Sequence, residues 1–333
     1  MNKIIIFSHE SDIDGLGSIV LGKLAFKNID YELFTNTEKL ELKFREYIEQ
    51  NKLDNYDKIY ITDLALYDPS LTMVANSNLK DKVLVFDHHK ASIDNNMNRY
   101  SFTKIVEEDE QGKRCGTNLF YEYLIDNKLL KNTLSISQFV EATTLEDTWE
   151  WKNHGIFGIQ AHNLSLLFNK VGIEEYIRRM VNKLEKLDNK PFIYDQEELL
   201  LIKNKYDEYQ KELKKIIDSI EYYIDEYENK FGVVYANYEY RNEIAEYIIN
   251  NNNPQDISYI IIVALDKGKY GQKSYRSIID AFDVNKIAIR HGGGGHPGAA
   301  MVNITPQQKA KALLLTKREG LKYLADSIYQ KEK

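Results

Sequence analysis

Four short apolar runs, each separated from the next by a longer polar or helical stretch, constrain the fold of the first part of this chain. The runs cover residues 3–8, 31–35, 58–62 and 82–86. Unbroken runs of β-branched and aromatic residues are typical of strands buried on both faces of a sheet. Because helical stretches separate these runs, consecutive strands are joined by crossovers and run parallel. The sequence therefore predicts an α/β domain with a parallel sheet flanked by helices.

The second half of the chain has a different pattern. Apolar spacing is helical from residue 118 to about 180, and residues 196–229 contain no Pro or Gly and predict one long connector helix. A new strand is expected over residues 231–236, and the apolar run 257–265 leads into a second strand at 272–278. That pair predicts a hairpin, and hence a smaller α/β domain with a mixed sheet.

Length and composition agree with this division. A chain of 333 residues, 43% of them hydrophobic, is long enough for two domains with their own cores. We expect a first domain over residues 1–190, a helical linker over 191–229 and a second domain over 230–333.

Charge and cysteine content limit the environment and the partners. Cys115 is the single cysteine, so no internal disulfide can form, which fits a reducing compartment. The net charge of −7 argues against coating of long duplex DNA. The apolar start is too short for a signal peptide, and no run has the length of a membrane span. We therefore expect a soluble cytoplasmic protein that binds neither long duplex DNA nor a membrane.

Acidic and histidine side chains follow three of the predicted strands. In an open parallel sheet, ligands bind beyond the carboxyl ends of the strands, so these residues are expected at one edge. A further acid lies in the later helical region. The candidate residues are His9, Asp12 and Asp14 after the first strand, Asp63 after the third, Asp87, His88 and His89 after the fourth, and Asp147.

Four aspartates at one site, Asp12, Asp14, Asp63 and Asp147, would repel one another strongly. Two like charges about 4 Å apart interact by about 4 kcal/mol at an effective dielectric constant of 20. Two divalent cations would neutralise the cluster, share one carboxylate and hold a hydroxide between them, which suits hydrolysis of a phosphate ester. Mixed carboxylate and imidazole ligands favour Mn²⁺, with Mg²⁺ or Co²⁺ as alternatives.

Each of these residues taken alone also has a purely structural explanation. Asp12 and Asp14 fit a helix N-cap and a turn, Asp63 fits a cap of the helix after it, and His9 fits a loop. Only their occurrence together, in this order after the strands, favours the metal site.

Four consecutive glycines, residues 292–295, form the other prominent motif. Such a run is not expected inside a helix or a strand, and its bare N–H groups can form an anion-binding concavity. His296, Arg290 and Arg276 add donors and positive charge, and an arginine can bind a phosphate through two parallel hydrogen bonds. The alternative is a flexible hairpin linker.

Four residues near the acidic positions have structural roles as their first explanation. Thr117 is expected to cap a helix, and Cys115 is expected to be a small buried residue. Trp149 and Trp151 are expected to pack against their helix.

These motifs together resemble the DHH phosphoesterase superfamily. Its first motif corresponds to SHESDIDGLGS, its second to YITDLAL, its third to VFDHHKAS and its fourth to EDTWEW. The later segment RHGGGGHPGAA resembles the signature of the DHHA1 domain, and SYRS resembles the strand segment that brings an arginine to the same cleft.

The resemblance implies a role for each matched residue. His9 and Asp12 would hold one metal ion, Asp14, His88 and Asp147 the other, and Asp63 both. His89 would contact the scissile phosphate, and Asp87 would orient the histidines. The substrate end would be bound in a cleft between the domains by Arg276, Ser277, Arg290, Gly293, Gly294, Gly295 and His296.

The resemblance also implies a function. Members with both domains and this length are similar to bacterial nano-RNases, which degrade very short single-stranded RNA, expected here in the 3′-to-5′ direction, and some also remove the 3′ phosphate of adenosine 3′,5′-bisphosphate (pAp). The main alternative is a phosphodiesterase of cyclic dinucleotides or of their linear products. The charge argues against a large RecJ-type DNA exonuclease, and the glycine run against a family II pyrophosphatase. A non-catalytic nucleotide sensor would be expected to lack part of the metal-ligand set, which is complete here.

Overall fold

A computed structural model of the chain describes residues 3–265, 271–279 and 282–329. It divides into two compact units, Met1–Tyr206 and Asp207–Lys333. The division falls within one helix, α9 (Gln196–Asp218). Ile202 in its first half packs in the core of the first unit, whereas Leu213 and Ile216 in its second half pack in the second.

The first unit is built on a five-stranded sheet in which every pairing is parallel, which confirms the predicted fold class. The strand order is β2-β1-β3-β4-β5. In sheets of this order, successive strands are added first on one side of β1 and then on the other, so the strand order switches between β1 and β3. Ligands bind at the carboxyl ends of those two strands. The strands are β1 (Ile4–His9), β2 (Asp30–Phe34), β3 (Lys58–Thr62), β4 (Val83–Asp87) and β5 (Thr103–Ile105).

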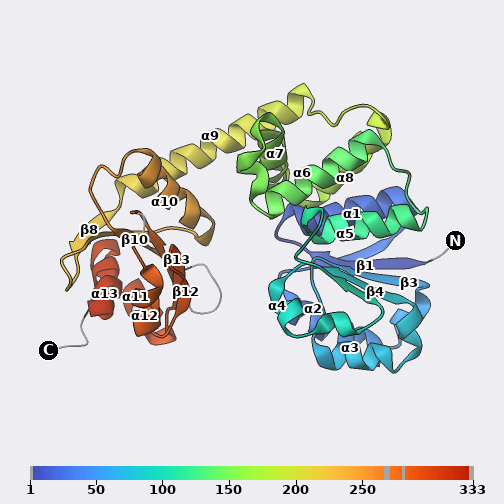
Figure 1. The fold of residues 1–333 in the computed structure, drawn as a ribbon, viewed down its shortest axis with the longest axis horizontal. Helices are drawn as coiled ribbons and strands as arrows, with labels where there is room; N and C mark the ends of the chain where they lie inside the picture. The colour runs from blue at the N-terminus through green and yellow to red at the C-terminus, as the bar shows by residue number, and fades with distance from the viewer. Residues whose placement is uncertain (1–2, 266–270, 280–281, 330–333) are drawn as a thin grey trace. The chain divides into compact units, whose positions relative to one another are not determined.

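Helices cover both faces of this sheet (Figure 1). One face carries α1 (Ile13–Phe26) and α5 (Gly116–Asp126), with three further helices packed around them. Each face of the sheet has its own apolar core, and successive residues of β1 contribute to the two cores in turn. Ile4 and Ile6 face α1, while Ile5 and Phe7 face the opposite layer. The remaining helices of the unit are α2 (Thr37–Glu49), α3 (Asp68–Ala75) and α4 (Lys90–Asp94) on the second face, and α6 (Leu134–Asp147), α7 (Gly155–Val171) and α8 (Ile173–Leu187) beyond α1.

The second unit contains a six-stranded mixed sheet in the order β12-β13-β11-β10-β9-β8, as predicted. Among the described strands of this sheet, β9 and β10 are the one pair that runs parallel. The predicted hairpin is present as the antiparallel pair of β10 and β11, and residues 266–270 of its connection lie outside the described residues. The strands are β8 (Glu221–Ile224), β9 (Lys230–Tyr235), β10 (Tyr259–Ala264), β11 (Gln272–Ser277), β12 (Gly294–His296) and β13 (Ala299–Asn303).

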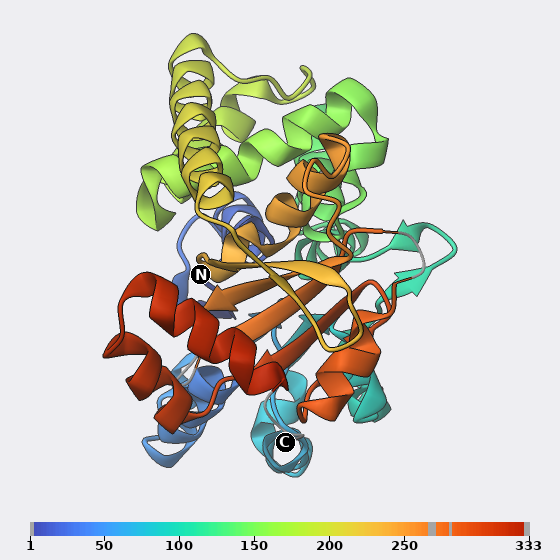
Figure 2. The same ribbon diagram turned by 90° about the vertical axis from the view of Figure 1, so that its left-hand side faces the viewer.

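Helices also lie on both faces of this second sheet. One core joins the sheet to the second half of α9 and to α10, and the other joins it to α11, α12 and α13. Figure 2 shows the C-terminal helices, coloured red, in front of the sheet. The helices are α10 (Arg241–Asn250), α11 (Val284–Arg290), α12 (Pro306–Leu313) and α13 (Lys317–Tyr329).

Short elements complete the described chain. A two-stranded hairpin joins β6 (Glu108–Asp109) to β7 (Gly112–Lys113). The 3-10 turns are η1 (Leu53–Asn55), η2 (Asn78–Asp81), η3 (Met97–Arg99), η4 (Glu150–Asn153) and η5 (Tyr238–Tyr240). No helix among the described residues is both long enough and apolar enough to cross a membrane.

The prediction of one long helix over residues 196–229 is wrong about where the helix ends. It ends at Asp218, and Glu221–Ile224 forms a strand that pairs with β9. The turn between these strands needs neither Pro nor Gly, because the Asp225 carboxylate accepts the N–H groups of Tyr227 and Asn229, both at 2.9 Å.

The expectation for the glycine run is also corrected, because Gly294–His296 forms the edge strand β12. The first two glycines end α11. Gly292 has a φ of 75° and donates its N–H to the carbonyl of Ile289, while Gly293 donates to the carbonyl of Ala288. This is the Schellman arrangement that closes a helix. The N–H groups of Gly292 and Gly293 therefore bind helix carbonyls and are not free to form an anion-binding concavity.

Candidate metal centre at the edge of the parallel sheet

The structure gathers the predicted acids and histidines of the first unit at the carboxyl ends of its strands. His9 is the last residue of β1, Asp63 directly follows β3, and Asp87 ends β4. Asp12 is the N-cap of α1 and accepts the N–H of Gly15 at 3.1 Å, so its expected capping role is real. The remaining residues are Asp14 in the first turn of α1, His88 and His89 after β4, and Asp147 at the end of α6.

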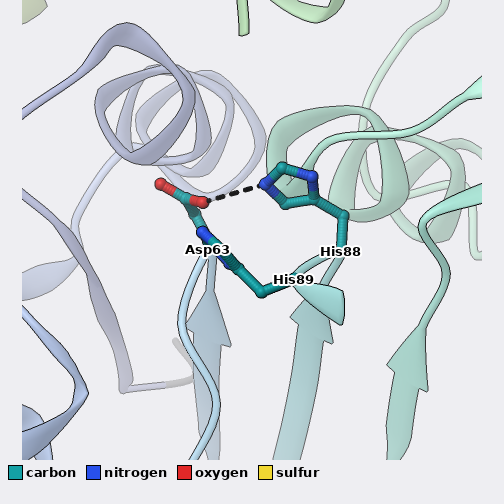
Figure 3. A group of neighbouring side chains, drawn as sticks. All are labelled: Asp63, His88 and His89. Carbon is teal, nitrogen blue, oxygen red and sulfur yellow. Dashed lines mark ion pairs between the residues drawn. The ribbon is translucent and has the colours of Figure 1, made fainter. Parts of the chain in front are cut away.

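Their ligand atoms form three groups, each with all atoms within 4.8 Å of one another. One group is His9, Asp12 and Asp63, and another is Asp14, His88 and Asp147. The third joins Asp63 and His88 to His89. Figure 3 shows Asp63 and His88 at the ends of neighbouring strands, with the imidazole turned toward the carboxylate. Asp63 therefore lies between two groups that could each hold a cation.

Three buried ligand atoms in this cluster have no hydrogen-bond partner among the residues that the structure describes: Asp63 Oδ2, His88 Nε2 and Asp147 Oδ2. His88 Nε2 lies 3.4 Å from Asp63 Oδ1 and 3.5 Å from Asp147 Oδ2. Buried polar atoms are nearly always satisfied in folded proteins. Unsatisfied oxygen and nitrogen atoms this close to further carboxylate and imidazole atoms are the donor set that a divalent cation needs.

Electrostatics supports the same interpretation. Burial, followed by the carboxylates of Asp12 and Asp14, raises the pKa of Asp63 well above its ordinary value. Burial and the Asp14 carboxylate raise the pKa of Asp147 to about 8. Burial alone would lower the pKa of His9, but the hydrogen bond to Asp12 and the nearby Asp63 carboxylate, 3.5 Å from His9 Nδ1, outweigh it and raise this pKa to about 10. Without cations the cluster therefore retains protons that a metal would displace.

The Asp14 carboxylate is held by the N-terminus of α5. It accepts the N–H of Gly116 at 2.7 Å and that of Thr117 at 2.6 Å, and the Thr117 hydroxyl donates to the backbone carbonyl of Asp14. The N-terminal N–H groups of a helix carry partial positive charge, which stabilises the buried carboxylate. Sequence reasoning missed this role of Gly116 and Thr117, although Gly-Thr at the start of a predicted helix was a usable signal.

The expected cap at Thr117 is wrong. Cys115 is the N-cap of α5, and its sulfur accepts the N–H of Asn118 at 3.4 Å. Cys115 is fully buried, as predicted. A Cβ on Gly116 would lie 2.6 Å from the backbone nitrogen of Asp63. Glycine at this position therefore lets α5 approach the residue that joins the two ligand groups.

Asp63 has a φ of 57°, in the left-handed region. Aspartate and asparagine tolerate this conformation better than most residues. Asp63 does not cap the next helix, because α3 begins at Asp68 with Tyr67 as its N-cap. The alternative capping role for Asp63 is therefore excluded.

Asp87 orients His89. One oxygen of the buried Asp87 carboxylate lies 2.7 Å from His89 Nδ1, and the other accepts the hydroxyl of Ser92 at 2.6 Å. The Asp87 hydrogen bond raises the pKa of His89, and burial opposes it. Since both Asp87 oxygens are engaged, this residue positions the imidazole, whose ring is about half exposed, at 52%.

The predicted substrate residues lie in the second unit, where β13 separates two of them. Arg276 on β11 and His296 on β12 both pair with Ala299 on β13. Directly paired residues point to the same face of a sheet, so both side chains project from the face that carries α10. Two strand spacings separate β11 from β12, which places the two residues about 10 Å apart. Arg276 Nε donates to Asn242 and Nη1 to Ser274, which anchors the guanidinium.

The other predicted substrate residues have partners of their own. Arg290 ends α11 and donates to the hydroxyl of Tyr227 at 2.9 Å. The Ser277 hydroxyl donates to the carbonyl of Ile279 at 2.7 Å. Gly294 and Gly295 lie in β12, and Gly293 precedes it. Of this set, Arg276 and His296 are the pair that the sheet register brings to one face.

The comparisons with known proteins agree with this geometry. Residues 3–145 match the model of the DHH family N-terminal domain, and residues 229–319 match the DHHA1 domain. The chain is 31% identical over 308 residues to oligoribonuclease NrnB of Bacillus subtilis (strain 168), which covers 91% of this chain and 73% of that protein.

Two solved structures are similar in fold. The structure of exonuclease RecJ bound to manganese superposes with a TM-score of 0.51 and 16% identity, covering 97% of this chain and 90% of that one. A DHH-domain structure described as a member of a family of ribosomal proteins superposes with a TM-score of 0.56 and 13% identity, covering 99% and 87%.

Proposed function

Because the chain belongs to the DHH family of phosphoesterases, hydrolases that act on phosphodiester bonds, we propose that it degrades RNA oligonucleotides of a few nucleotides to mononucleotides. The observation that carries the proposal is that Asp63, His88 and Asp147 each bring a buried ligand atom without a hydrogen-bond partner among the described residues to the sheet edge, where His88 lies within 3.5 Å of both carboxylates. The identity with an oligoribonuclease along most of the chain supports short RNA as the substrate.

The residues fit two divalent cations. His9 and Asp12 would hold one, Asp14, His88 and Asp147 the other, and Asp63 both. The mixture of carboxylate and imidazole favours Mn²⁺ over Mg²⁺. When bound, such ions supply Lewis-acid activation of water and of the phosphate.

The residues around the cluster supply orientation and hydrogen bonding. Asp87 accepts from His89 Nδ1 and so directs His89 Nε2 outward as a donor for a phosphate oxygen. A donor aimed at charge that develops in the transition state lowers the barrier to reaction. Asp14, fixed by Gly116 and Thr117, gives the site a rigid carboxylate that does not reorganise during the reaction.

In the second unit, we propose that Arg276 and His296 bind the part of the substrate away from the bond that breaks. Asn242 and Ser274 engage Nε and Nη1 of Arg276, which leaves Nη2 without a hydrogen bond to any described residue. The Arg276 guanidinium would therefore bind a phosphate through Nη2. The expected pair of parallel hydrogen bonds would require a second donor that is not already engaged. Burial, followed by the nearby Arg241, lowers the pKa of Arg276.

The test is a ladder of end-labelled RNAs from two to about twenty-four nucleotides, with Mn²⁺, Mg²⁺ or chelator present. We expect the highest kcat/KM for about two to five nucleotides, faster turnover with Mn²⁺ than with Mg²⁺, release from the 3′ end and no activity after chelation. Cyclic dinucleotides, their linear products and pAp are tested as substrates in parallel assays.

Equal kcat/KM at all lengths would indicate a general exonuclease. Rapid hydrolysis of a cyclic dinucleotide without cleavage of any RNA would overturn the proposal in favour of a cyclic-dinucleotide phosphodiesterase. Binding of nucleotides with no hydrolysis of any of these substrates would favour a sensor.

A further inference from the structure

Trp149 occupies an unusual backbone position directly after α6. The helix ends at Asp147 and is capped by Thr148, so Trp149 is the first residue beyond the cap, and its φ is 61°. Glycine or asparagine is the usual residue at this left-handed position, and a bulky side chain there is strained. Strain at such a position persists only where the surrounding structure or a function maintains it.

Packing does not explain the choice of tryptophan. We expected Trp149 and Trp151 to pack against their helix. Trp151 packs against the core of the first unit, and its indole stacks on His162 of the next helix, α7, with ring centroids 4.2 Å apart and planes 13° apart. The Trp149 side chain is 47% exposed. Among the described residues no aromatic ring stacks on it, and Lys152 Nζ lies over its ring, 5.3 Å from the ring centroid.

The position of Trp149 along the chain places it beside the metal centre. Asp147, two residues earlier, offers a ligand atom to the group that contains Asp14 and His88. Two residues of chain span at most about 7 Å. A nucleotide whose phosphate is held at this group carries its base one sugar ring away, a comparable distance. An exposed indole is well suited to stack on such a base, whatever its identity.

We propose that Trp149 is the stacking platform for the base of the nucleotide whose phosphate lies at the metal centre. The inference rests on the proposed function, since it requires a nucleotide substrate. It gives the strained backbone a function: the left-handed turn holds an indole that is 47% exposed, and since Lys152 Nζ lies over one ring face, a base would stack on the other. Lys152 beside the ring adds positive charge where an anionic ligand would lie.

The main competing occupant is a protein surface. Ile156 and Ile159 in the first turns of α7 are 80% and 59% exposed, and they lie on one face of that helix. If Trp149 belonged to an interface between copies of this chain, its truncation would change the molecular mass in solution. If it binds a base, truncation would change substrate affinity at unchanged mass.

The experiment compares Trp149→Ala, Trp149→Phe and Tyr206→Ala with the wild-type protein. Tyr206 is also 47% exposed, but it lies in α9, which carries no residue of the metal centre. The substrates are a dinucleotide RNA and two versions that lack one base each. Stacked bases contribute a roughly 5- to 150-fold effect in alanine substitutions. We expect Trp149→Ala to raise KM for the intact dinucleotide within that range, Trp149→Phe to restore most of the affinity, and Tyr206→Ala to have no effect.

The effect of Trp149→Ala should disappear on one of the two base-lacking substrates. An equal loss on all three substrates, or no loss on any, would refute the stacking role. A change of molecular mass in the alanine variant, measured by sedimentation at unchanged KM, would assign Trp149 to an interface instead.

Two further measurements separate this inference from the proposed function and from a folding role. Adenosine 5′-monophosphate with Mg²⁺ should quench the tryptophan fluorescence of the wild-type protein more than that of Trp149→Phe. That result without any RNA cleavage would leave the inference standing while the proposed function falls. RNA cleavage with equal quenching in both proteins would support the proposed function and refute the stacking role of Trp149.

Trp149→Gly should raise the Tm, because glycine relieves the left-handed strain, and raise KM at the same time. A fall in Tm with unchanged KM would show that the indole supports the fold.

Discussion

Replacement of Asp63 by asparagine should stabilise the metal-free protein while it abolishes activity. Asp63 is 2% exposed, and its ligand oxygen lies within 4.8 Å of that of Asp12. Two like charges at that distance interact by about 3.5 kcal/mol at an effective dielectric constant of 20. Asparagine keeps the shape and tolerates the φ of 57° that this position requires.

The positive charge of His9 offsets part of this repulsion, and proton uptake limits the rest. We therefore expect a net gain of about 1–3 kcal/mol in the free energy of unfolding at neutral pH. For a unit of this size that corresponds to a Tm about 2–10 °C higher in chelator. With Mn²⁺ the order should reverse, because wild-type protein gains about 2.7 kcal/mol at a metal concentration of a hundred times Kd and the variant loses a ligand to both ions.

The pH dependence gives the sharper test. Since folding raises the pKa of Asp63, its contribution is most favourable below the unfolded pKa and is lost as pH rises through the folded pKa. The advantage of Asp63→Asn in chelator should therefore vanish near pH 4 and grow toward pH 8. Differential scanning fluorimetry with and without Mn²⁺ measures the difference in Tm between Asp63→Asn and wild type. The matched control is Asp126→Asn, which changes an exposed acid of the same unit. A metal-free variant less stable than wild type at pH 8 would contradict the expected charge repulsion at Asp63, and a variant that still binds two ions would contradict its role as a shared ligand.

Four other outcomes are expected. His89→Ala should lower kcat by about 10²- to 10³-fold at unchanged metal content, whereas loss of an ion, measured by mass spectrometry, would make His89 a ligand. Gly116→Ala should reduce stability by about 1–3 kcal/mol and reduce turnover, because its Cβ would meet the backbone of Asp63; an unchanged Tm and rate would show that this close approach is not needed. Metal-free wild-type protein should lose stability as pH rises from about 4 to about 8, since folding raises the pKa of Asp147 to about 8, and Mn²⁺ should flatten this curve in thermal melts. Arg276→Ala should raise KM for dinucleotides more than it lowers kcat in steady-state assays, and the opposite split would place Arg276 in the chemical step.

Local patterns were enough to predict the parallel sheet and the position of the acids. The apolar run of residues 58–62 is too short for a helix and rich in β-branched and aromatic residues, which favours a buried strand, and Asp63 follows it directly. The carboxyl ends of parallel strands meet at one edge, so residues that follow different strands had to lie near one another. The grouping of their ligand atoms within 4.8 Å follows from that rule.

Local patterns failed where a segment has more than one possible partner. Residues 221–224 carry helix-compatible and strand-compatible side chains, and pairing with β9 decided in favour of a strand. The glycine run looked like a free loop, but contacts with α11 and β13 use its N–H groups and its bare surface. A Cβ on Gly293 would lie 2.0 Å from the carbonyl oxygen of Met301.

Strand periodicity and chain order are local properties, so they were sufficient to predict which acids and histidines follow which strands. How those residues are held depends on tertiary packing. Asp14 receives its two N–H donors from residues 102 and 103 positions away, and Trp149 is exposed while Trp151 is stacked. Such arrangements depend on the packing of distant segments, and no local pattern in the chain records which segments will meet.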